Sequence, residues 1–378
     1  MAKFDFIIVG AGFAGATCAR LLTDKGYSCL IIEERPFVGG NCACDTQNDI
    51  TVHAFGPHVF HTNNEDVWYF VKDKATWLNY KHNVCFYNKK LYHLPFNLNL
   101  LNDIYVKTFP NDCISALNND LTKENNLLNN LRDYSLHNFG SKIYDLYIKD
   151  YYKKVYDVSP ENLSNAIIKD INIDWDSYTS SFYNDQFQGI PDEGYTYVIE
   201  QIIGDIPILL NTNFLSNKDR YIKLANNIIY TGEIDKLFNW CVGELHWQSI
   251  KFVIRNESEH TTSLIGMPEL RFSDPTINWY RITEHKWFTP HRQNNDIFNK
   301  NTIISYEYGD KWERGKEPFY PIINKTSQNI YKRYYDKIKQ TYSNFYLCGR
   351  KAEYKNYNMA ETIESAMKLC DNWDYKNL

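Results

Sequence analysis

The alternation of apolar and polar positions at the start of the chain predicts a strand, a helix and a second strand in quick succession. Residues 4–9 form a short apolar run that ends at Gly10, and residues 14–25 carry apolar side chains at helical spacing. Gly26 follows that helix, as a glycine often does after a last turn, and residues 28–32 form a second β-rich run. This order is typical of the first unit of a dinucleotide-binding α/β fold.

A different pattern begins after the first 65 residues. Residues 66–160 are rich in Asn, Asp, Lys, Leu and Tyr, and few of their segments alternate like a strand. Residues 112–157 look mostly helical, because their apolar side chains recur at the spacing of one helix face. The positions on that face include Leu131, Tyr134, Ile143, Leu146 and Tyr147. We therefore expect an inserted helical domain.

The second half of the chain returns to β character, at residues 222–230, 249–254 and 302–308. Residues 361–370 predict a closing helix. Two Asn-rich stretches, residues 125–130 and 294–301, are expected to be loops. The fold class predicted from these patterns is α/β.

Composition narrows the classes of function. The 378 residues are 43% hydrophobic and 23% charged, a globular balance that excludes wholesale disorder. The formal net charge is -5 and no basic tail is present, so a nucleic-acid partner is not expected. No apolar run approaches the ~20 residues of a membrane helix, and the first residues lack a signal-peptide pattern. Membrane insertion is therefore not expected.

The cysteines point to a reducing compartment. There are nine of them, an odd number, and no CxxC pairs accompany them. Free thiols in the cytoplasm are the expected state. Zinc is not expected, because Cys42 and Cys44 are too close together and lack a second pair.

The first turn carries a dinucleotide-binding pattern. Gly10, Gly12 and Gly15 form GxGxxG with Phe13 and Ala14 between them, after a strand and at the start of a helix. Gly10 permits the tight turn, Gly12 lets a pyrophosphate approach, and Gly15 lets helix and strand pack closely. Glu33 follows 18 residues after Gly15, where a carboxylate accepts hydrogen bonds from ribose hydroxyls. A glycine-rich turn without a ligand is the alternative.

The motif alone leaves NAD and FAD open, and the following segment favours FAD. Glu34 and Arg35 come directly after Glu33, and a Gly-Gly turn leads to Gly40 and Asn41. A basic residue before such a turn suits the pyrophosphate and ribityl chain of a larger cofactor, as in the amine-oxidase and glutathione-reductase-like flavoproteins that it resembles. A plain surface turn is the alternative.

Three histidines then fall within nine positions, at His53, His58 and His61. Their spacing fits no simple helical pair, so no metal site is expected. With the preceding motifs, this block resembles the bacterial UDP-galactopyranose mutases. Further blocks agree in order and spacing: LPFN at 94–97, QGIP at 188–191, GYT at 194–196, YTG at 230–232, RI at 281–282 with EHK at 284–286, EPFYP at 317–321, and CGR at 348–350 with AEYK at 352–355. The resemblance spans residues 4 to about 367.

The resemblance implies an FAD-dependent isomerase that interconverts the pyranose and furanose forms of a nucleotide sugar, for surface polysaccharide biosynthesis. It implies that N5 of the reduced flavin attacks the anomeric carbon and expels the nucleoside diphosphate. Members of the family carry a Rossmann-like FAD-binding domain, a helical domain and an antiparallel sheet. Here we expect the first at 1–65 with about 220–255 and 335–378, the second at about 66–170, and the third at about 171–220 with 256–334. Many members are dimers, so a homodimer is one expectation.

The resemblance also assigns site residues. It places Arg281 and Arg350 at the diphosphate, lets the Tyr320 phenol donate to a phosphate oxygen, and sets His58 near the reactive face of the flavin. Further cofactor contacts are expected from Val59, Gly349 and Met359. Further substrate contacts are expected from Asn97, Tyr152, Tyr156, Trp175 and Asn356. The structural alternative is an ion pair for Arg281 and Arg350, core packing for Tyr320, a satisfied buried histidine for His58 and a turn for Asn97.

Departures from the family pattern cluster on the substrate side. No arginine occurs between Arg132 and Arg220, although the family places one on a mobile loop over the diphosphate. The matching stretch, residues 172–176, carries acids and a tryptophan, and Lys169 is the nearest cation. Other altered positions are Tyr156, Asp157, Cys241, Gln248, Asn356 and Asn358. We hypothesise another nucleotide sugar, with N-acetylgalactosamine, fucose, a heptose or a different base as candidates, while UDP-galactopyranose stays the first guess.

Two other classes of protein remain as alternatives. A flavin oxidoreductase such as an amine oxidase shares the first motifs but leaves the Arg281 and Arg350 blocks unexplained. A flavoprotein that binds a nucleotide sugar without turnover would explain the missing loop arginine.

Overall fold

The predicted strand–helix–strand unit is present as β1 (Phe4–Val9), α1 (Phe13–Asp24) and β2 (Cys29–Ile32). The computed structural model describes residues 3–122, 128, 130–168, 171–178, 181–294 and 296–376. The two strands belong to a five-stranded parallel sheet in the order β12-β2-β1-β13-β19. Its other strands are β12 (Ile208–Leu209), β13 (Ala225–Tyr230) and β19 (Phe345–Leu347).

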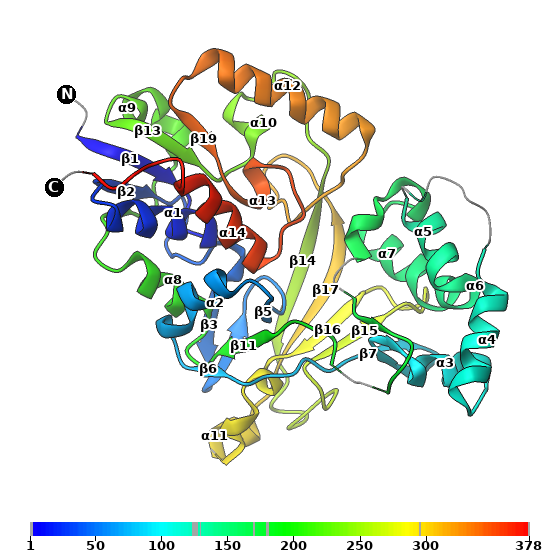
Figure 1. Cartoon of the computed structure of the whole chain (residues 1–378). Coiled ribbons are helices and arrows are strands. Elements are labelled where there is room, and N and C mark those ends of the chain that lie inside the picture. Colours follow the sequence, from blue (N-terminus) through cyan, green and yellow to red (C-terminus); the bar gives the residue numbers. More distant parts are fainter. Residues whose placement is uncertain are drawn as a thin grey trace.

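Helices cover both faces of this parallel sheet because its strands are apolar on both sides. Phe6 and Ile8 of β1 are buried with α1, α8 (Tyr195–Ile203) and α14 (Met359–Cys370), and Figure 1 shows α1 beside α14. Ile7 between them is buried on the opposite face. That face packs on α9 (Lys218–Ile222), α10 (Ile234–Leu237) and α12 (Lys325–Thr341). The layers are those of a Rossmann-like fold.

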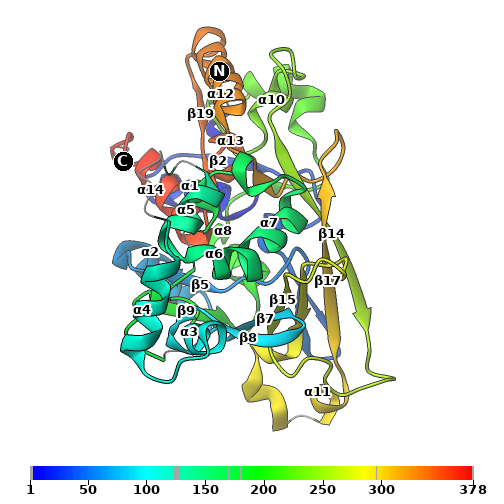
Figure 2. The same cartoon turned by 90° about the vertical axis from the view of Figure 1, so that its right-hand side faces the viewer.

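A second sheet has seven strands in the order β18-β14-β17-β16-β15-β7-β8. They are β7 (Val84–Asn88), β8 (Lys90–Leu94), β14 (Trp247–Asn256), β15 (Glu269–Phe272), β16 (Arg281–Glu284), β17 (Ile303–Lys311) and β18 (Tyr320–Pro321). All neighbours are antiparallel except β15 and β7. The view of Figure 2 shows the long strands β14 and β17 lying along one side of the molecule.

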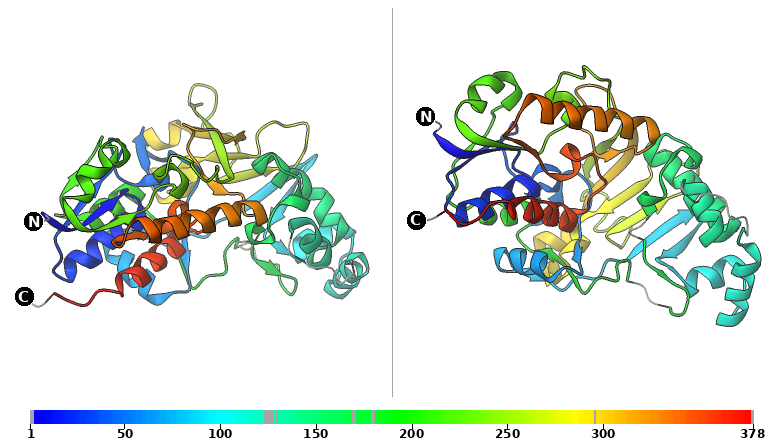
Figure 3. Two further views of the ribbon diagram at one scale, coloured as in Figure 1. Left: turned by 90° about the horizontal axis from the view of Figure 1, so that it is seen from above. Right: turned by 45° about the horizontal axis from the view of Figure 1, so that its top comes forward.

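The helices formed by residues 98–156 gather at the end of the molecule opposite the two termini (Figure 3). They are α3 (Leu98–Tyr105), α4 (Pro110–Asp120), α5 (Leu131–Asn138), α6 (Gly140–Ile143) and α7 (Lys149–Tyr156), with a π-helical turn at Tyr144–Ile148. Leu131, Ile143 and Tyr147 are fully buried in their common core, and Tyr134 and Leu146 pack against it. The predicted apolar face is therefore confirmed.

Short elements complete the chain. They are β3 (Cys44–Gln47), β4 (Ile50–His53), β5 (Phe60–Thr62), α2 (Glu65–Val71), β6 (Trp77–Leu78), β9 (Phe96–Asn97), β10 (Ile173–Asp174), β11 (Phe187–Pro191), α11 (Asp296–Lys300) and α13 (Gly349–Ala352). Among the described helices, none is long and apolar enough to cross a membrane.

The structure differs from the sequence predictions in several places. The β7–β8 hairpin lies within the stretch that was expected to be helical, and it extends the antiparallel sheet through β15. β14, expected with the parallel sheet, belongs to the antiparallel one, whereas α8 and β12 lie with the parallel sheet. The loop predicted at 294–301 is wrong, because α11 forms there and buries Phe298 against Ile303. Most of the other predicted loop, 125–130, lies outside the described residues.

Candidate active site

A cavity of about 420 Å³ opens at the carboxyl ends of β1, β2 and β13. Its lining includes Val9, Ile32 and Tyr230, which are the last residues of those strands. The lining continues onto β16 and α7. The carboxyl edge of a parallel sheet is where ligands bind in doubly wound folds.

The glycine-rich turn between β1 and α1 is shaped by contacts that only glycine permits. Gly10 has a φ of +102°, in the region that favours glycine. A Cβ on Gly15 would lie 1.9 Å from the Gly10 carbonyl oxygen, so helix and strand could not pack as they do. Gly10, Gly12, Phe13 and Ala14 all line the cavity, while Gly15 supports the turn from behind. The N-terminus of α1 therefore faces the cavity, as an anion site requires.

Glu33 and Arg35 hold the next loop. The Glu33 carboxylate accepts hydrogen bonds from the backbone N–H of Ala11 (2.7 Å) and of Arg35 (2.8 Å). The Arg35 guanidinium donates to the Gly40 carbonyl (2.8 Å) and to the Asn41 side chain (3.0 Å). Each of these five residues except Ala11 lines the cavity. Because a carboxylate has about four acceptor positions, Glu33 keeps capacity for a ligand.

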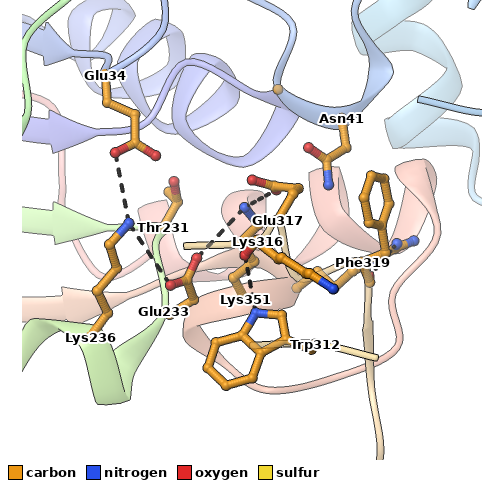
Figure 4. A network of polar contacts seen from close by, with 12 residues as sticks. Glu34, Asn41, Thr231, Glu233, Lys236, Trp312, Lys316, Glu317, Phe319 and Lys351 are labelled. Atoms are coloured by element: carbon orange, nitrogen blue, oxygen red, sulfur yellow. Dashed lines mark hydrogen bonds and ion pairs between the residues drawn. The ribbon is translucent and has the colours of Figure 1, made fainter. Parts of the chain in front are cut away.

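Alternating charges border the same part of the cavity (Figure 4). Lys236 lies 3.8 Å from Glu34 and 4.0 Å from Glu233, and Lys351 lies 3.9 Å from Glu233 and forms an ion pair with Glu317. Burial raises the pKa of Glu233, and the two lysines offset part of that rise. Glu233, Lys236 and Lys351 were not predicted from the sequence, although Glu233 and Lys351 directly adjoin Gly232 and Arg350, which lie in motifs of the family.

The three histidines of the 53–61 block have different surroundings. The ring of His58 lines the cavity, and burial together with the charge of Arg350 lowers its pKa to about 3, so it is neutral near pH 7. His53 is buried behind it and accepts a hydrogen bond from the His58 backbone N–H (3.0 Å). His61 lies 2.8 Å from the Asp185 carboxylate and also lines the cavity, as does Val59.

Arg350 offers a cation without an acid partner. Its guanidinium donates to the carbonyls of Tyr357 and Phe319, the latter at 3.2 Å, and no carboxylate lies within ion-pair distance of it among the described residues. It lies 5.5 Å from the centroid of the Tyr320 ring. Both side chains line the cavity, and so do Gly349 and Met359.

Arg281 is held by a buried carboxylate. Its Nε and Nη2 donate to the two oxygens of Glu307 at 2.8 and 2.6 Å, and Glu307 is fully buried. The Tyr280 hydroxyl donates to the same carboxylate at 2.8 Å. This fork fixes the arginine against the cavity wall that β16 provides.

Aromatic side chains from α7 form the far wall. The rings of Tyr152 and Tyr156 are stacked with centroids 6.4 Å apart, and Tyr156 lies 5.9 Å from Tyr320. Asn356 and Asn358 line the cavity nearby, and the Asn358 side chain caps α14 by accepting from the Glu361 N–H. Such a wall suits the flat face of a nucleobase.

Two predicted substrate residues do not line this cavity. Asn97 is fully buried, and its side chain caps α3 by accepting from the N–H groups of Asn99 and Leu100. Trp175 packs on the helical core, with its ring parallel to that of Phe96 at 6.3 Å. Asn97 therefore has a structural role as a helix cap, and the substrate contacts predicted for Asn97 and Trp175 find no support in the lining of this cavity.

Known proteins agree with the resemblance. A family profile described as "UDP-galactopyranose mutase" matches residues 146–356, more than half of the chain, and one described as "NAD(P)-binding Rossmann-like domain" matches residues 8–73. A probable UDP-galactopyranose mutase of Klebsiella pneumoniae is 29% identical over 98% of this chain and 94% of its own. A dTDP-fucopyranose mutase of Escherichia coli is 27% identical over 96% of both chains.

Solved structures extend the likeness to the fold. A reduced UDP-galactopyranose mutase superposes with a TM-score of 0.74 at 15% identity, over 98% of this chain and 95% of the other. A putrescine oxidase superposes with a TM-score of 0.58 at 11% identity, over 98% and 99%. The predicted α/β fold class is confirmed, and the putrescine oxidase shares the fold.

Proposed function

Because this chain belongs to the UDP-galactopyranose mutase family, we propose that it is an FAD-dependent isomerase that interconverts the pyranose and furanose forms of a nucleotide sugar. The observation that carries the proposal is one cavity that joins a dinucleotide-binding turn to Arg350, a cation without an acid partner, and to the fixed Arg281. The alternative of an amine oxidase leaves these two arginines unexplained.

FAD is the cofactor of this family, and the residues present fit it. The N-terminus of α1 and the Gly10–Gly12 turn suit the pyrophosphate, and the Glu33 carboxylate suits a ribose. Phe13, Ala14, Glu34, Arg35, Gly40, Asn41, Val59, Gly349 and Met359 would complete the contacts, since all of them line the cavity. When bound and reduced, the flavin supplies the nucleophile, its N5, for the anomeric carbon.

The chain's own part is to bind and release the diphosphate. Loss of this group from the sugar leaves negative charge on phosphate oxygens, which fixed donors stabilise best when water is excluded. Arg350 offers its charge without a competing carboxylate, and the Glu307 fork keeps Arg281 from reorganising. Tyr320 adds a phenol beside Arg350.

His58 takes part as a neutral donor or acceptor. With its pKa lowered to about 3, the ring carries no charge that would compete with the two arginines for the diphosphate. Its backbone is fixed from both sides, by His53 and by the Tyr195 hydroxyl, which donates to the His58 carbonyl at 3.1 Å. We assign it to orienting hydroxyls of the sugar.

The sugar and the base of the substrate are to be identified by experiment. UDP-galactose is the first candidate, and the relative described as a dTDP-fucopyranose mutase supports an NDP-fucose as the second. UDP-N-acetylgalactosamine and an NDP-heptose follow. Tyr152 and Tyr156 are proposed to face the base, and Asn356 the phosphates or the sugar.

The test is chromatography of nucleotide sugars after incubation with the dithionite-reduced, FAD-loaded protein. UDP-galactofuranose and dTDP-fucofuranose are supplied separately, because closure to the six-membered ring is downhill. We expect one of them to be converted to its pyranose form by reduced protein and not by oxidised protein. Tight nucleoside diphosphate binding without conversion of any sugar on a wider panel would instead favour a binding protein without turnover.

Two further expectations accompany this function. A cytoplasmic location rests on the cysteines, all nine of which are free thiols in the structure. A homodimer rests on the family alone and is checked by light scattering.

A further inference from the structure

Two arginines lie side by side on the wall of the cavity. Arg271 of β15 is directly opposite Arg281 of β16 in the antiparallel pair, so their side chains leave the same face of the sheet about 5 Å apart. Both line the cavity. Arg271 belongs to none of the sequence blocks that carry the family resemblance, and no role was assigned to it from the sequence.

Arg271 is fixed by its neighbours but keeps donors free. Its Nε pairs with Glu269 at 2.5 Å, and its Nη1 donates to the Tyr147 hydroxyl at 3.2 Å. The guanidinium lies over the ring of Phe182, 4.6 Å from its centroid. Among the described residues Nη2 has no hydrogen-bond partner, and the side chain is 11% exposed, which leaves this nitrogen for a ligand in the cavity.

The charge balance of this wall favours an anion. Glu269 forms an ion pair with Arg271 and also lies 3.8 Å from Arg281, which forms its own ion pair with Glu307. Burial would raise the pKa of Glu269, but the charges of Arg271 and Arg281 hold it well below its usual range, so it stays ionised. On this wall Arg271 and Arg281 are balanced by Glu269 and Glu307, which do not line the cavity, and Arg350 adds a positive charge that a diphosphate would neutralise.

Residues 172–176, which match the loop where the family carries an arginine, direct the Asp174 carboxylate away from the cavity. Asp174 accepts from the Asp176 N–H at 3.1 Å and from the Ser177 hydroxyl at 2.5 Å, within its own turn. Trp175 packs on Phe96, and Lys169 lies outside the described residues. This segment therefore offers no described cation to the cavity.

We propose that Arg271 binds the diphosphate of the substrate together with Arg281, and supplies the positive charge that residues 172–176 lack. The inference rests on the proposed function and specifies its binding site. Two guanidinium groups carried by directly opposed residues on one face of the sheet can each bind oxygens of one diphosphate, and each contact is charge-assisted. The alternative is a purely structural role, in which Arg271 only neutralises the charge of Glu269 within the sheet.

The experiment uses the oxidised, FAD-loaded protein and needs no turnover. UDP and dTDP, and the nucleosides uridine and thymidine, are titrated by calorimetry into the unaltered protein, Arg271→Gln and Arg271→Lys. Arg255→Gln is the matched control, an exposed arginine on β14 of the same sheet that does not line the cavity. FAD content and the urea midpoint are recorded for every variant.

We expect Arg271→Gln to weaken the nucleoside diphosphate that binds by on the order of 10- to 100-fold and to leave its nucleoside unchanged. Arg271→Lys should lie between, because it keeps the charge but loses the planar fork. If Arg271→Gln does not fold, the pair Glu269→Gln/Arg271→Met removes both charges at once and should show the same selective loss.

Equal diphosphate affinities for Arg271→Gln and the unaltered protein, with FAD retained, would overturn this assignment alone. Equal losses for diphosphate and nucleoside would also overturn it, since they indicate a structural role. No diphosphate binding by the unaltered, FAD-loaded protein would overturn the assignment and the proposed function together.

Discussion

Removing the buried Glu307 carboxylate that holds Arg281 separates the contribution of this ion pair to stability from its contribution to activity. In Glu307→Gln the shape is kept, but one of the two oxygens that Arg281 contacts at 2.8 and 2.6 Å becomes an NH2 donor, the negative charge is lost, and the remaining acid, Glu269, lies 3.8 Å away. Breaking a buried pair by removing one partner costs about 3–5 kcal/mol, because the other charge stays buried. Gln also withdraws the strong acceptor of the Tyr280 hydroxyl.

The double variant Arg281→Met/Glu307→Gln removes both charges. We expect it to recover most of the lost free energy of unfolding, since no uncompensated charge is left. Its conversion activity should nevertheless fall by about 2.7–4 kcal/mol of transition-state stabilisation, or on the order of 100- to 1,000-fold in kcat, because a fixed donor to the diphosphate is gone. Stability is measured by urea unfolding, and activity by the sugar-conversion assay.

The reasoning is refuted by either of two results. One is a Glu307→Gln protein as stable as its parent, which would mean that the pair contributes little to folding. The other is a double variant that keeps full activity, which would place Arg281 outside the chemistry. Arg255→Gln, on the same sheet, controls for loss of any arginine.

Three further outcomes are expected. Arg350→Met should retain FAD but lose on the order of 100-fold in conversion rate, since it is the cation without an acid partner; unchanged turnover in the same assay would contradict this role. Gly15→Ala should be isolated without FAD, as read from flavin absorbance, because its Cβ would lie 1.9 Å from the Gly10 carbonyl oxygen. Burial holds the His58 pKa at about 3, against about 6.5 in the unfolded chain, so the free energy of unfolding is highest above pH 6.5 and declines as the pH falls toward 3. Between pH 7.5 and 5 the His58→Asn variant should therefore lose about 2 kcal/mol less of this free energy than the unaltered protein. Equal shifts of the urea midpoint in the two proteins would argue against a buried neutral ring.

The sequence predicted the structure correctly where glycines and the spacing of apolar residues determine the backbone geometry. Gly10 and Gly15 predicted the β1–α1 turn because few other residues can occupy those positions. The β7–β8 hairpin escaped the same reasoning, since Lys90 and Leu91 on its exposed strand interrupt the alternation. Its strand character comes from pairing with β15, a partner nearly 200 residues away.

The site was predictable in part for a similar reason. Residues within motifs, such as Arg281 and Arg350, could be named from the sequence, and the structure brings them to one cavity. Arg271 could not, because only the register of β15 against β16 places it beside Arg281. Asn97 shows the reverse case: an Asn before an apolar helical run is also the signature of an N-cap, and that is the use the fold makes of it.

The packing of α14 on α1 sets the order in which the protein can become functional during synthesis. The cavity needs the first turn of the chain and also Arg350 and Met359, which are synthesised about 340 residues after that turn. Until β19 and α14 emerge, α1 keeps an uncovered apolar face and β13 keeps an open edge. Cofactor capture therefore waits until β19 and α14 have been synthesised, and a chain that stops before residue 345 would be a substrate for chaperones and proteases rather than a weaker enzyme.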